Sequence, residues 1–357
     1  MSNSSFINSL KKNITALIGL FVIIFFFVIA ILGYWIMPDD TPMANDRIPE
    51  IRKLSPGSRV TILLKKKNRT VDSHSFLERY TKGQPSNYIS KAIETYKYTP
   101  KGSLIYAPYG FKDKFDTIPA NIVKTDIKII EKKYWLGTDK AGRDLLSMLI
   151  YGARISLMVG IIAVSISLVI GIILGGIAGY YRGWIDTLIL WFISVIWSVP
   201  GILLVIGISI ALQSKGVWVA FLAVGMTMWV EVARVVRGQV MEVREKQYVV
   251  AAKALGFHDI RIIFKHILPN IIAPVIVIAT ANFASSILVE AGLSFLGLGT
   301  QPPTPSWGQL VREGYQLMGN KNSWHILSFP CICISLLVLS FNLVGNALRD
   351  WASPSSI

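Results

Sequence analysis

Long apolar runs alternate with polar segments along this chain of 357 residues. A helix needs about 20 consecutive apolar residues to cross the hydrocarbon core of a bilayer, and six runs reach that length. They are Ile14–Trp35, Ile155–Tyr180, Ile185–Leu212, Val217–Val236, Ile271–Leu293 and Ile326–Leu348. Because lipid offers no hydrogen-bond partner to a free backbone amide, we expect each run to be helical. The pattern predicts an all-α integral membrane protein with six transmembrane helices.

The first apolar run lies where a secretory signal would lie, but it is long and no small-residue cleavage site follows it. We therefore interpret it as an uncleaved anchor. Basic residues orient the chain, because short cytoplasmic segments carry an excess of Lys and Arg. Lys11, Lys12, Arg182, Arg349 and the basic segment between the fourth and fifth runs all fall on one side of six crossings. Both termini are expected to be cytoplasmic.

Composition agrees with a membrane protein, since 52% of the residues are hydrophobic, 16% are charged and the mean hydropathy is +0.51. A net charge of +15 would suggest a nucleic-acid partner for a soluble domain. Here, cytoplasmic loops held against anionic headgroups account for it, and we expect no nucleic acid. The two cysteines lie two residues apart and the four histidines lack zinc spacing, so no metal site is expected.

A long polar segment, residues 38–135, separates the first two apolar runs. It is basic, but long loops are translocated with little regard to charge, and we place it outside the cytoplasm. Thr61–Leu64 and Ser103–Tyr106 are candidate strands among Gly and Pro residues. We expect a small mixed α/β insert. The alternative is a disordered linker, against which the aromatic residues of the segment argue.

The predicted organisation has four parts. Residues 1–37 form a cytoplasmic tail with the first transmembrane helix, and 38–135 form the insert. Residues 136–350 hold the other five spans and a cytoplasmic loop at 241–270, and 351–357 form a cytoplasmic tail.

The segment between the fourth and fifth apolar runs has helical periodicity. Tyr248, Ala251, Ala252 and Leu255 recur at i, i+3, i+4 and i+7, which predicts one apolar stripe on a short helix. Gly256 follows, where a helix needs a left-handed residue in order to end.

A second short helix is expected after this glycine. Asp259 suits the free amides at its start, Ile260 and Phe264 belong to its apolar stripe, and Pro269 closes it. Two such helices either lie on lipid headgroups or dock against a partner protein. Periodicity alone does not decide between these alternatives.

The spacing of Ala251-Ala252, Gly256 and Leu268-Pro269 resembles the "EAA" loop of permease subunits of bacterial ABC importers, most closely the oligopeptide, dipeptide and nickel group. Three more segments agree with that group in order. They are LGTDKAGRDLLSMLIYGARISL (Leu136–Leu157), WVEVARVVRGQV (Trp229–Val240) and ILVEAGLSFLGLGTQPPTPSWG (Ile287–Gly308). Two positions depart from the family pattern: Val250 replaces an acidic residue, and His266 replaces an apolar one.

This resemblance implies a fold of the type I ABC importer permease kind, with the segment as a coupling loop that rests on an ATPase subunit. The residues expected to form the docking site are Tyr248, Val250, Ala251, Ala252, Leu255, Gly256, Asp259, Arg261, Leu268 and Pro269. A carboxylate contact at position 250 is not expected, because valine stands there.

The resemblance also implies partners and a location. They are a second, related permease subunit, two ATP-binding subunits and an extracytoplasmic substrate-binding protein, in the cytoplasmic (inner) membrane of a bacterium. The solute would be a peptide or a similar solute such as a nickel chelate. ATP and Mg would bind to the partner subunits, and no cofactor to this chain.

The chain itself has no GxxxxGK[ST] phosphate loop and no HExxH motif. We therefore predict that it is not an enzyme. Two rival functions remain open from sequence: an ion-coupled secondary transporter that acts alone, and a membrane scaffold that transports nothing.

Candidate path or gate residues lie within the spans. Gly171, Gly175 and Gly179 recur every four residues, which favours close helix packing or a lining for the solute path. Polar side chains inside spans are costly and often functional, and those considered are Asn282, Glu290 and Asn342.

Other features of the spans give local predictions. Pro200 and Pro274 would kink their helices at a gate or be compensated by local packing, and Glu231 would pair with Arg234. After the fifth span, an apolar stripe predicts a surface helix or a docking face for a binding protein. Its residues are Trp307, Leu310, Val311, Tyr315 and Met318.

Overall fold

The computed structural model describes residues 13–68, 74–111, 113–214, 216–319 and 323–352. Lys11, Lys12 and the tail from residue 353 onward lie outside these ranges. The chain forms two compact units. We call Met1–Phe27, Ser156–Gln301 and Cys333–Ile357 the helical unit, and Val28–Ile155 and Pro302–Ile332 the sheet unit.

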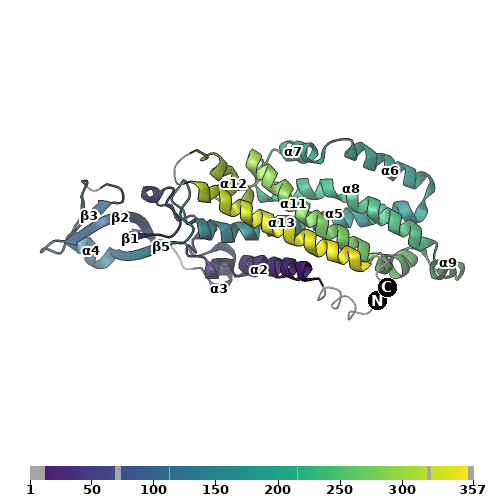
Figure 1. The fold of residues 1–357 in the computed structure, drawn as a ribbon, viewed down its shortest axis with the longest axis horizontal. Coiled ribbons are helices and arrows are strands. Elements are labelled where there is room, and N and C mark those ends of the chain that lie inside the picture. The colour runs from purple at the N-terminus through teal and green to yellow at the C-terminus, as the bar shows by residue number, and fades with distance from the viewer. Residues whose placement is uncertain (1–12, 69–73, 112, 215, 320–322, 353–357) are drawn as a thin grey trace. The chain divides into compact units, whose positions relative to one another are not determined.

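Five single helices are long and apolar enough to cross a membrane (Figure 1). They are α2 (Ile14–Ile36), α5 (Leu145–Tyr181), α8 (Val217–Arg244), α11 (Ile272–Leu296) and α13 (Trp324–Ala352). These helices confirm five of the six predicted spans within the described residues.

The third predicted span, Ile185–Leu212, is not one helix. It consists of α6 (Gly183–Trp197) and α7 (Gly201–Ala211), whose axes differ by 87°. Pro200 explains the break, because it lacks a backbone N–H and disfavours helical conformation in the residue before it. Pro274, in contrast, lies in the first turn of α11, where a missing N–H costs nothing. The predicted kink at Pro274 is therefore absent.

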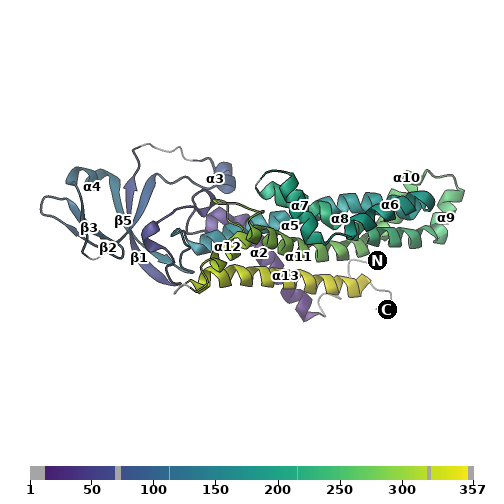
Figure 2. The ribbon, with the colours of Figure 1, turned by 90° about the horizontal axis from the view of Figure 1, so that it is seen from above.

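Helix α8 is the most buried of these spans and packs against α11 and α7 (Figures 1 and 2). At one end of the helical unit, Val236, Val240 and Val243 of α8 form a buried cluster with Ile262 and Ile267. This cluster attaches the polar segment after α8 to the helix bundle.

The sheet unit contains an antiparallel sheet of five strands in the order β4-β3-β2-β1-β5. The strands are β1 (Ser58–Lys66), β2 (Tyr88–Tyr98), β3 (Leu104–Pro108), β4 (Asp116–Ile118) and β5 (Ile127–Tyr134). The mixed α/β insert is thus confirmed, and the linker alternative is wrong for the described residues. The two predicted strands lie within β1 and at β3, whereas β2, β4 and β5 were missed.

Side chains pack on both faces of the sheet. Alternate residues of β1 point to opposite sides. Val60 and Ile62 pack with Tyr134 and the short turn at Pro49–Ile51, whereas Leu63 packs on the other face. Helix α4 (Ala120–Asp126) lies over that second face (Figure 1). A short helix, α3 (Phe76–Lys82), begins with a capping box at Ser75.

Helix α12 (Trp307–Tyr315) also belongs to the sheet unit, and its apolar stripe is only partly buried. Trp307 and Leu310 are buried, but Tyr315 and Met318 are exposed. The helix buries Glu313 instead, because that carboxylate enters an ion network described next.

Arg143 is the centre of this buried network. Its guanidinium lies 2.6 Å from Asp139 and 3.3 Å from Glu313, and Lys140 lies 3.8 Å from Glu313. Burial raises the pKa of Glu313, and the charge of Arg143 opposes that rise. Nearby, the Trp307 indole donates a hydrogen bond of 2.9 Å to the carbonyl of Leu149. The network joins α12 to the start of α5.

Candidate functional site

The segment after α8 begins with the two-turn helix α9 (Gln247–Ala254). Gly256 ends it with a φ of 77°, a left-handed conformation that glycine adopts without strain. The N–H of Gly256 donates to the carbonyl of Lys253 at 3.0 Å, and the N–H of Phe257 to that of Ala252 at 3.2 Å. These two bonds are the Schellman motif, so the predicted helix end at Gly256 is confirmed.

The second helix is present but irregular. It starts as α10 (Asp259–Ile262), continues as a π turn (η3, Ile263–Ile267) and ends as a 3₁₀ turn (η4, Leu268–Asn270). Asp259 is its first residue, as predicted, and accepts a 2.6 Å hydrogen bond from the hydroxyl of Tyr180 at the end of α5.

The predicted apolar stripe of α9 is only partly buried. Ala252 is buried with Val249 against α8, whereas Tyr248, Ala251 and Leu255 are exposed. Val249 lies outside the predicted stripe, yet it supplies a contact with the bundle. The difference arises because this two-turn helix has apolar residues on more than one face. Packing against the buried cluster of α8 determines which of them are buried.

Apolar side chains therefore remain exposed on the outer side of the segment. We call them the coupling tip, and each is between 45% and 74% exposed: Tyr248, Val250, Leu255, Ile260 and Phe264. An exposed apolar group of this size is typical of an interaction surface.

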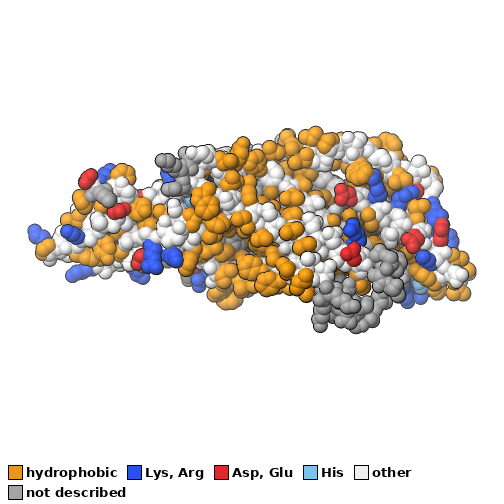
Figure 3. All heavy atoms as spheres, viewed as in Figure 1, with side chains coloured by type: hydrophobic (Ala, Val, Ile, Leu, Met, Phe, Trp, Pro, Cys, Tyr) orange, Lys and Arg blue, Asp and Glu red, His pale blue; other side chains and the backbone are white. Residues whose placement is uncertain are grey.

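Basic side chains surround this tip, and Figure 3 shows Lys and Arg gathered over the same end of the helical unit. A pocket of about 270 Å³ beside Val250 is lined by Arg182, Arg244 and Lys253. Arg182 pairs with Glu245 at 2.7 Å. Arg244 and Lys253 have no carboxylate within 4.0 Å among the described residues. Such cations favour an acidic partner surface.

The glycines of α5 form a helix contact. A Cβ at Gly171, Gly175 or Gly179 would collide with Val232, Ala233 or Val240 of α8, respectively. Backbones this close leave no room for a solute between α5 and α8.

The three polar path candidates are not brought together. Glu290 is fully buried and accepts a 2.7 Å hydrogen bond from Ser294. Asn282 is also buried, with its amide 3.5 Å from the carbonyl of Met228, and Asn342 is exposed on α13. Their role in transport stays a prediction.

The predicted pair of Glu231 and Arg234 does not form. Arg234 lies over the ring of Trp197, 3.6 Å from its centroid, and the next arginine, Arg237, binds Asp186 at 2.5 Å. Trp197 and Asp186 both come from α6, a partner that the spacing within α8 did not reveal.

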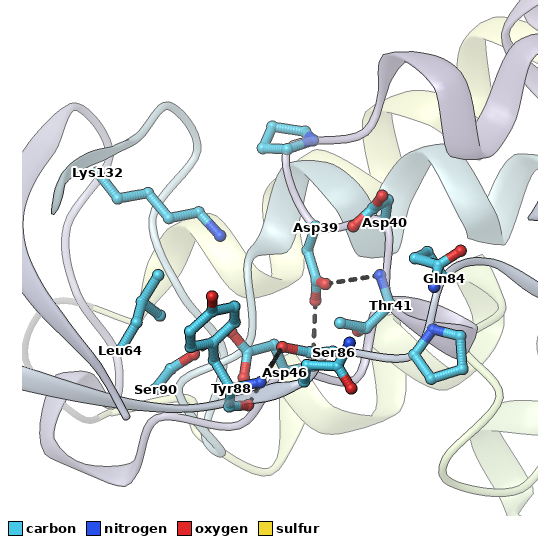
Figure 4. A pocket seen from close by; sticks show the side chains of 13 residues that line it. Asp39, Asp40, Thr41, Asp46, Leu64, Gln84, Ser86, Tyr88, Ser90 and Lys132 are labelled. Carbon is cyan, nitrogen blue, oxygen red and sulfur yellow. Dashed lines mark hydrogen bonds between the residues drawn. The ribbon is translucent and has the colours of Figure 1, made fainter. Parts of the chain in front are cut away.

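A second pocket lies in the sheet unit (Figure 4). Its volume is about 300 Å³, and Asp39, Asp46 and Lys132 are among its lining residues. Asp39 accepts hydrogen bonds from two backbone amides, and Asp46 accepts one from Ser90. Burial raises the pKa of Asp46. These carboxylates already have partners, so we assign the pocket no ligand.

Comparison with known families identifies the chain. The model described as "Binding-protein-dependent transport system inner membrane component" matches residues 167–356, more than half of the sequence. The chain belongs to this family. The model described as "N-terminal TM domain of oligopeptide transport permease C" matches residues 4–56 of the permease.

Curated relatives of the permease have related names. A dipeptide transport system permease protein DppC of Alkalihalophilus pseudofirmus is 44% identical, over 62% of this chain and 72% of the relative. The oligopeptide transport system permease protein OppC of Bacillus subtilis is 36% identical, over 70% of this chain and 80% of the relative. A glutathione transport system permease protein GsiD of Pectobacterium atrosepticum is 40% identical, over 62% of this chain and 72% of the relative.

One solved structure similar to the permease is that of the MetNI methionine ABC transporter in an inward-facing conformation. Its chain is 17% identical in sequence, with a TM-score of 0.49, and the alignment covers 58% of this chain and 97% of the chain in that structure. The sequence relatives and family models confirm the predicted permease of the oligopeptide and dipeptide group, in a multi-pass inner-membrane location. The nickel part of the resemblance stays a prediction.

Proposed function

We propose that this permease is one of two related membrane subunits of an ATP-driven peptide importer, and that an ATPase subunit docks on its coupling tip. The observation that carries the docking proposal is the group of exposed apolar side chains beside Arg244 and Lys253, for which the described residues supply no carboxylate within 4.0 Å. Relatives with dipeptide, oligopeptide and glutathione transport in their names support a peptide as solute.

The remaining parts of the assembly follow from the family. Two partner subunits bind and hydrolyse ATP with Mg, and this chain binds no cofactor. Both termini and the coupling tip lie in the cytoplasm, which places the insert on the outer side together with an extracytoplasmic binding protein. Six crossings, with α6 and α7 counted together as one broken span, and the distribution of Lys and Arg support this orientation.

The contacts of the segment provide a route for motion. Ile262 and Ile267 are buried in the same cluster as Ile271, which directly precedes α11. The hydrogen bond that the Tyr180 hydroxyl donates to Asp259 joins the same turn to α5. Movement of a docked ATPase is thereby passed to two spans as a rigid-body shift, with Gly256 as the flexible joint.

Replacing Leu255 with aspartate is expected to reduce recovery of the ATPase subunits at least tenfold. Leu255 is 74% exposed, so the permease itself loses no packing. Docking would instead bury a charge without a partner, which costs several kcal/mol, and each 1.4 kcal/mol corresponds to tenfold in affinity. The measurement is co-purification of the tagged, assembled transporter, with ATPase subunits identified by mass spectrometry and ATP hydrolysis.

Leu77→Asp is the matched control. Leu77 lies on α3 and is 73% exposed, so it has the same chemistry and exposure outside the coupling tip. The control should retain the ATPase subunits. Equal recovery with Leu255→Asp and Leu77→Asp would exclude docking at this tip.

A further inference from the structure

The break between α6 and α7 opens a cavity inside the helical unit. Its volume is about 320 Å³, and both helix ends line it, with Trp197 from α6 and Gly201 from α7. Helix α8 contributes Thr227 and Glu231, and α11 contributes Ser285. A discontinuous helix beside a cavity is an arrangement that membrane transporters use for ligand binding.

Glu231 brings a negative charge into this cavity. It stands near the middle of α8 and is exposed, and no cation lies within 4.0 Å of it among the residues that the structure describes. Of the two arginines that follow it on α8, Arg237 pairs with Asp186, and Arg234 lies over the ring of Trp197 at the edge of the cavity without forming an ion pair with Glu231. A carboxylate at this depth is costly unless water or a ligand compensates it.

The helix ends add charge of defined sign. The last carbonyls of α6, at Trp197, form the negative end of a helix dipole, with the same sign as Glu231. The first amides of α7, at Gly201 and Ile202, have no intrahelical acceptor and form a positive end. The wall formed by Glu231 and the end of α6 therefore attracts cations, whereas the start of α7 favours an anionic or carbonyl group.

We propose that this cavity binds the N-terminal ammonium group of a transported peptide, with Glu231 as its counter-ion. This inference rests on the proposed peptide import. A volume of about 320 Å³ is at the lower end of small-ligand sites, roughly 300–1,000 Å³. The cavity therefore holds one end of a peptide, whose first carbonyl groups then face the amides of α7.

Charged thiol reagents test the charge of the cavity directly. Ser285→Cys, in a background with Cys331 and Cys333 changed to serine, places a thiol on the cavity wall. The two reagents are the cationic ethylammonium methanethiosulfonate and the anionic ethylsulfonate methanethiosulfonate. In the purified transporter, we expect the ratio of the cationic to the anionic reaction rate to be about tenfold higher at Ser285→Cys than for a free thiol in solution. Glu231→Gln should remove this preference.

Ser165→Cys provides the control thiol. Ser165 is exposed on α5 and does not line the cavity, so Glu231→Gln should leave its reagent preference unchanged. A Ser285→Cys preference that is absent, or that survives Glu231→Gln, would overturn the proposal. Lack of any reaction would also overturn it, because the cavity would then be closed to water.

Protection by peptide tests the ligand. Ala-Ala should slow modification of Ser285→Cys at least threefold, and N-acetyl-Ala-Ala, which has no ammonium group, should not. Equal protection by both peptides, or protection that persists in Glu231→Gln, would contradict ammonium binding. These rates do not depend on ATPase docking, so their outcome is separate from that of Leu255→Asp.

Discussion

Replacing Arg143 with methionine is expected to lower the free energy of unfolding of the permease by about 3–5 kcal/mol. The Arg143 side chain is only 3% exposed and contacts both Asp139 and Glu313. Methionine has a similar length but no charge, so two buried carboxylates would lose their shared cation. The measurement is unfolding of the purified permease by a denaturing detergent.

Arg59→Met is the control for this change. Arg59 also forms an ion pair, with Glu131 at 3.9 Å, but its side chain is 67% exposed. Exposed pairs contribute at most about 1 kcal/mol, so this variant should unfold nearly as wild type does. If Arg143→Met and Arg59→Met behave alike, the buried network does not stabilise the fold.

The loss of unfolding free energy in Arg143→Met should also depend on pH. Burial raises the pKa of Glu313 and Arg143 opposes that rise, so the variant has a still higher folded-state pKa. Below the unfolded-state pKa the carboxyl is protonated in both states and the charge penalty is absent. The penalty grows as pH rises through the folded-state pKa. Unfolding of Arg143→Met should therefore approach that of wild type in acid, whereas Arg59→Met should show no such trend.

This network also shows what the sequence could not reveal. Arg143 and Glu313 are 170 residues apart, and nothing in the local pattern of either segment joins them. Periodicity identifies the apolar residues of α12 and makes no statement about Glu313. Tertiary pairing buries this side chain, because a carboxylate can be buried once a cation accompanies it.

Local rules worked where local chemistry decides the structure. The spans followed from the length of the apolar runs, and the end of α9 followed from the left-handed conformation of Gly256. The face of α9 that packs on the bundle did not follow, because Val249 and Leu255 are both apolar and only the cluster with α8 determines which of them is buried. Likewise, Pro200 marked the break in the third span, but nothing in the local pattern specifies its 87° angle.

Gly175→Val is expected to prevent α5 and α8 from packing and to abolish most of the folded permease. The added Cβ would collide with the carbonyl oxygen of Ala233. Overpacking against mobile side chains costs about 1–3 kcal/mol, and a backbone carbonyl in a helix yields less than a side chain does. The two helices would have to separate along their whole contact. The measurement is the yield of monodisperse permease in mild detergent, together with its thermal midpoint.

Gly176→Val separates this steric effect from the effect of valine itself. Gly176 is the next residue of α5, and a Cβ there meets no atom within 4 Å. Both substitutions make the same change in side-chain volume and helix propensity, but only one of them enters the contact with α8. Gly176→Val should give a normal yield. If Gly175→Val also folds normally, α5 and α8 do not approach at their backbones, and a space between them becomes available for the solute.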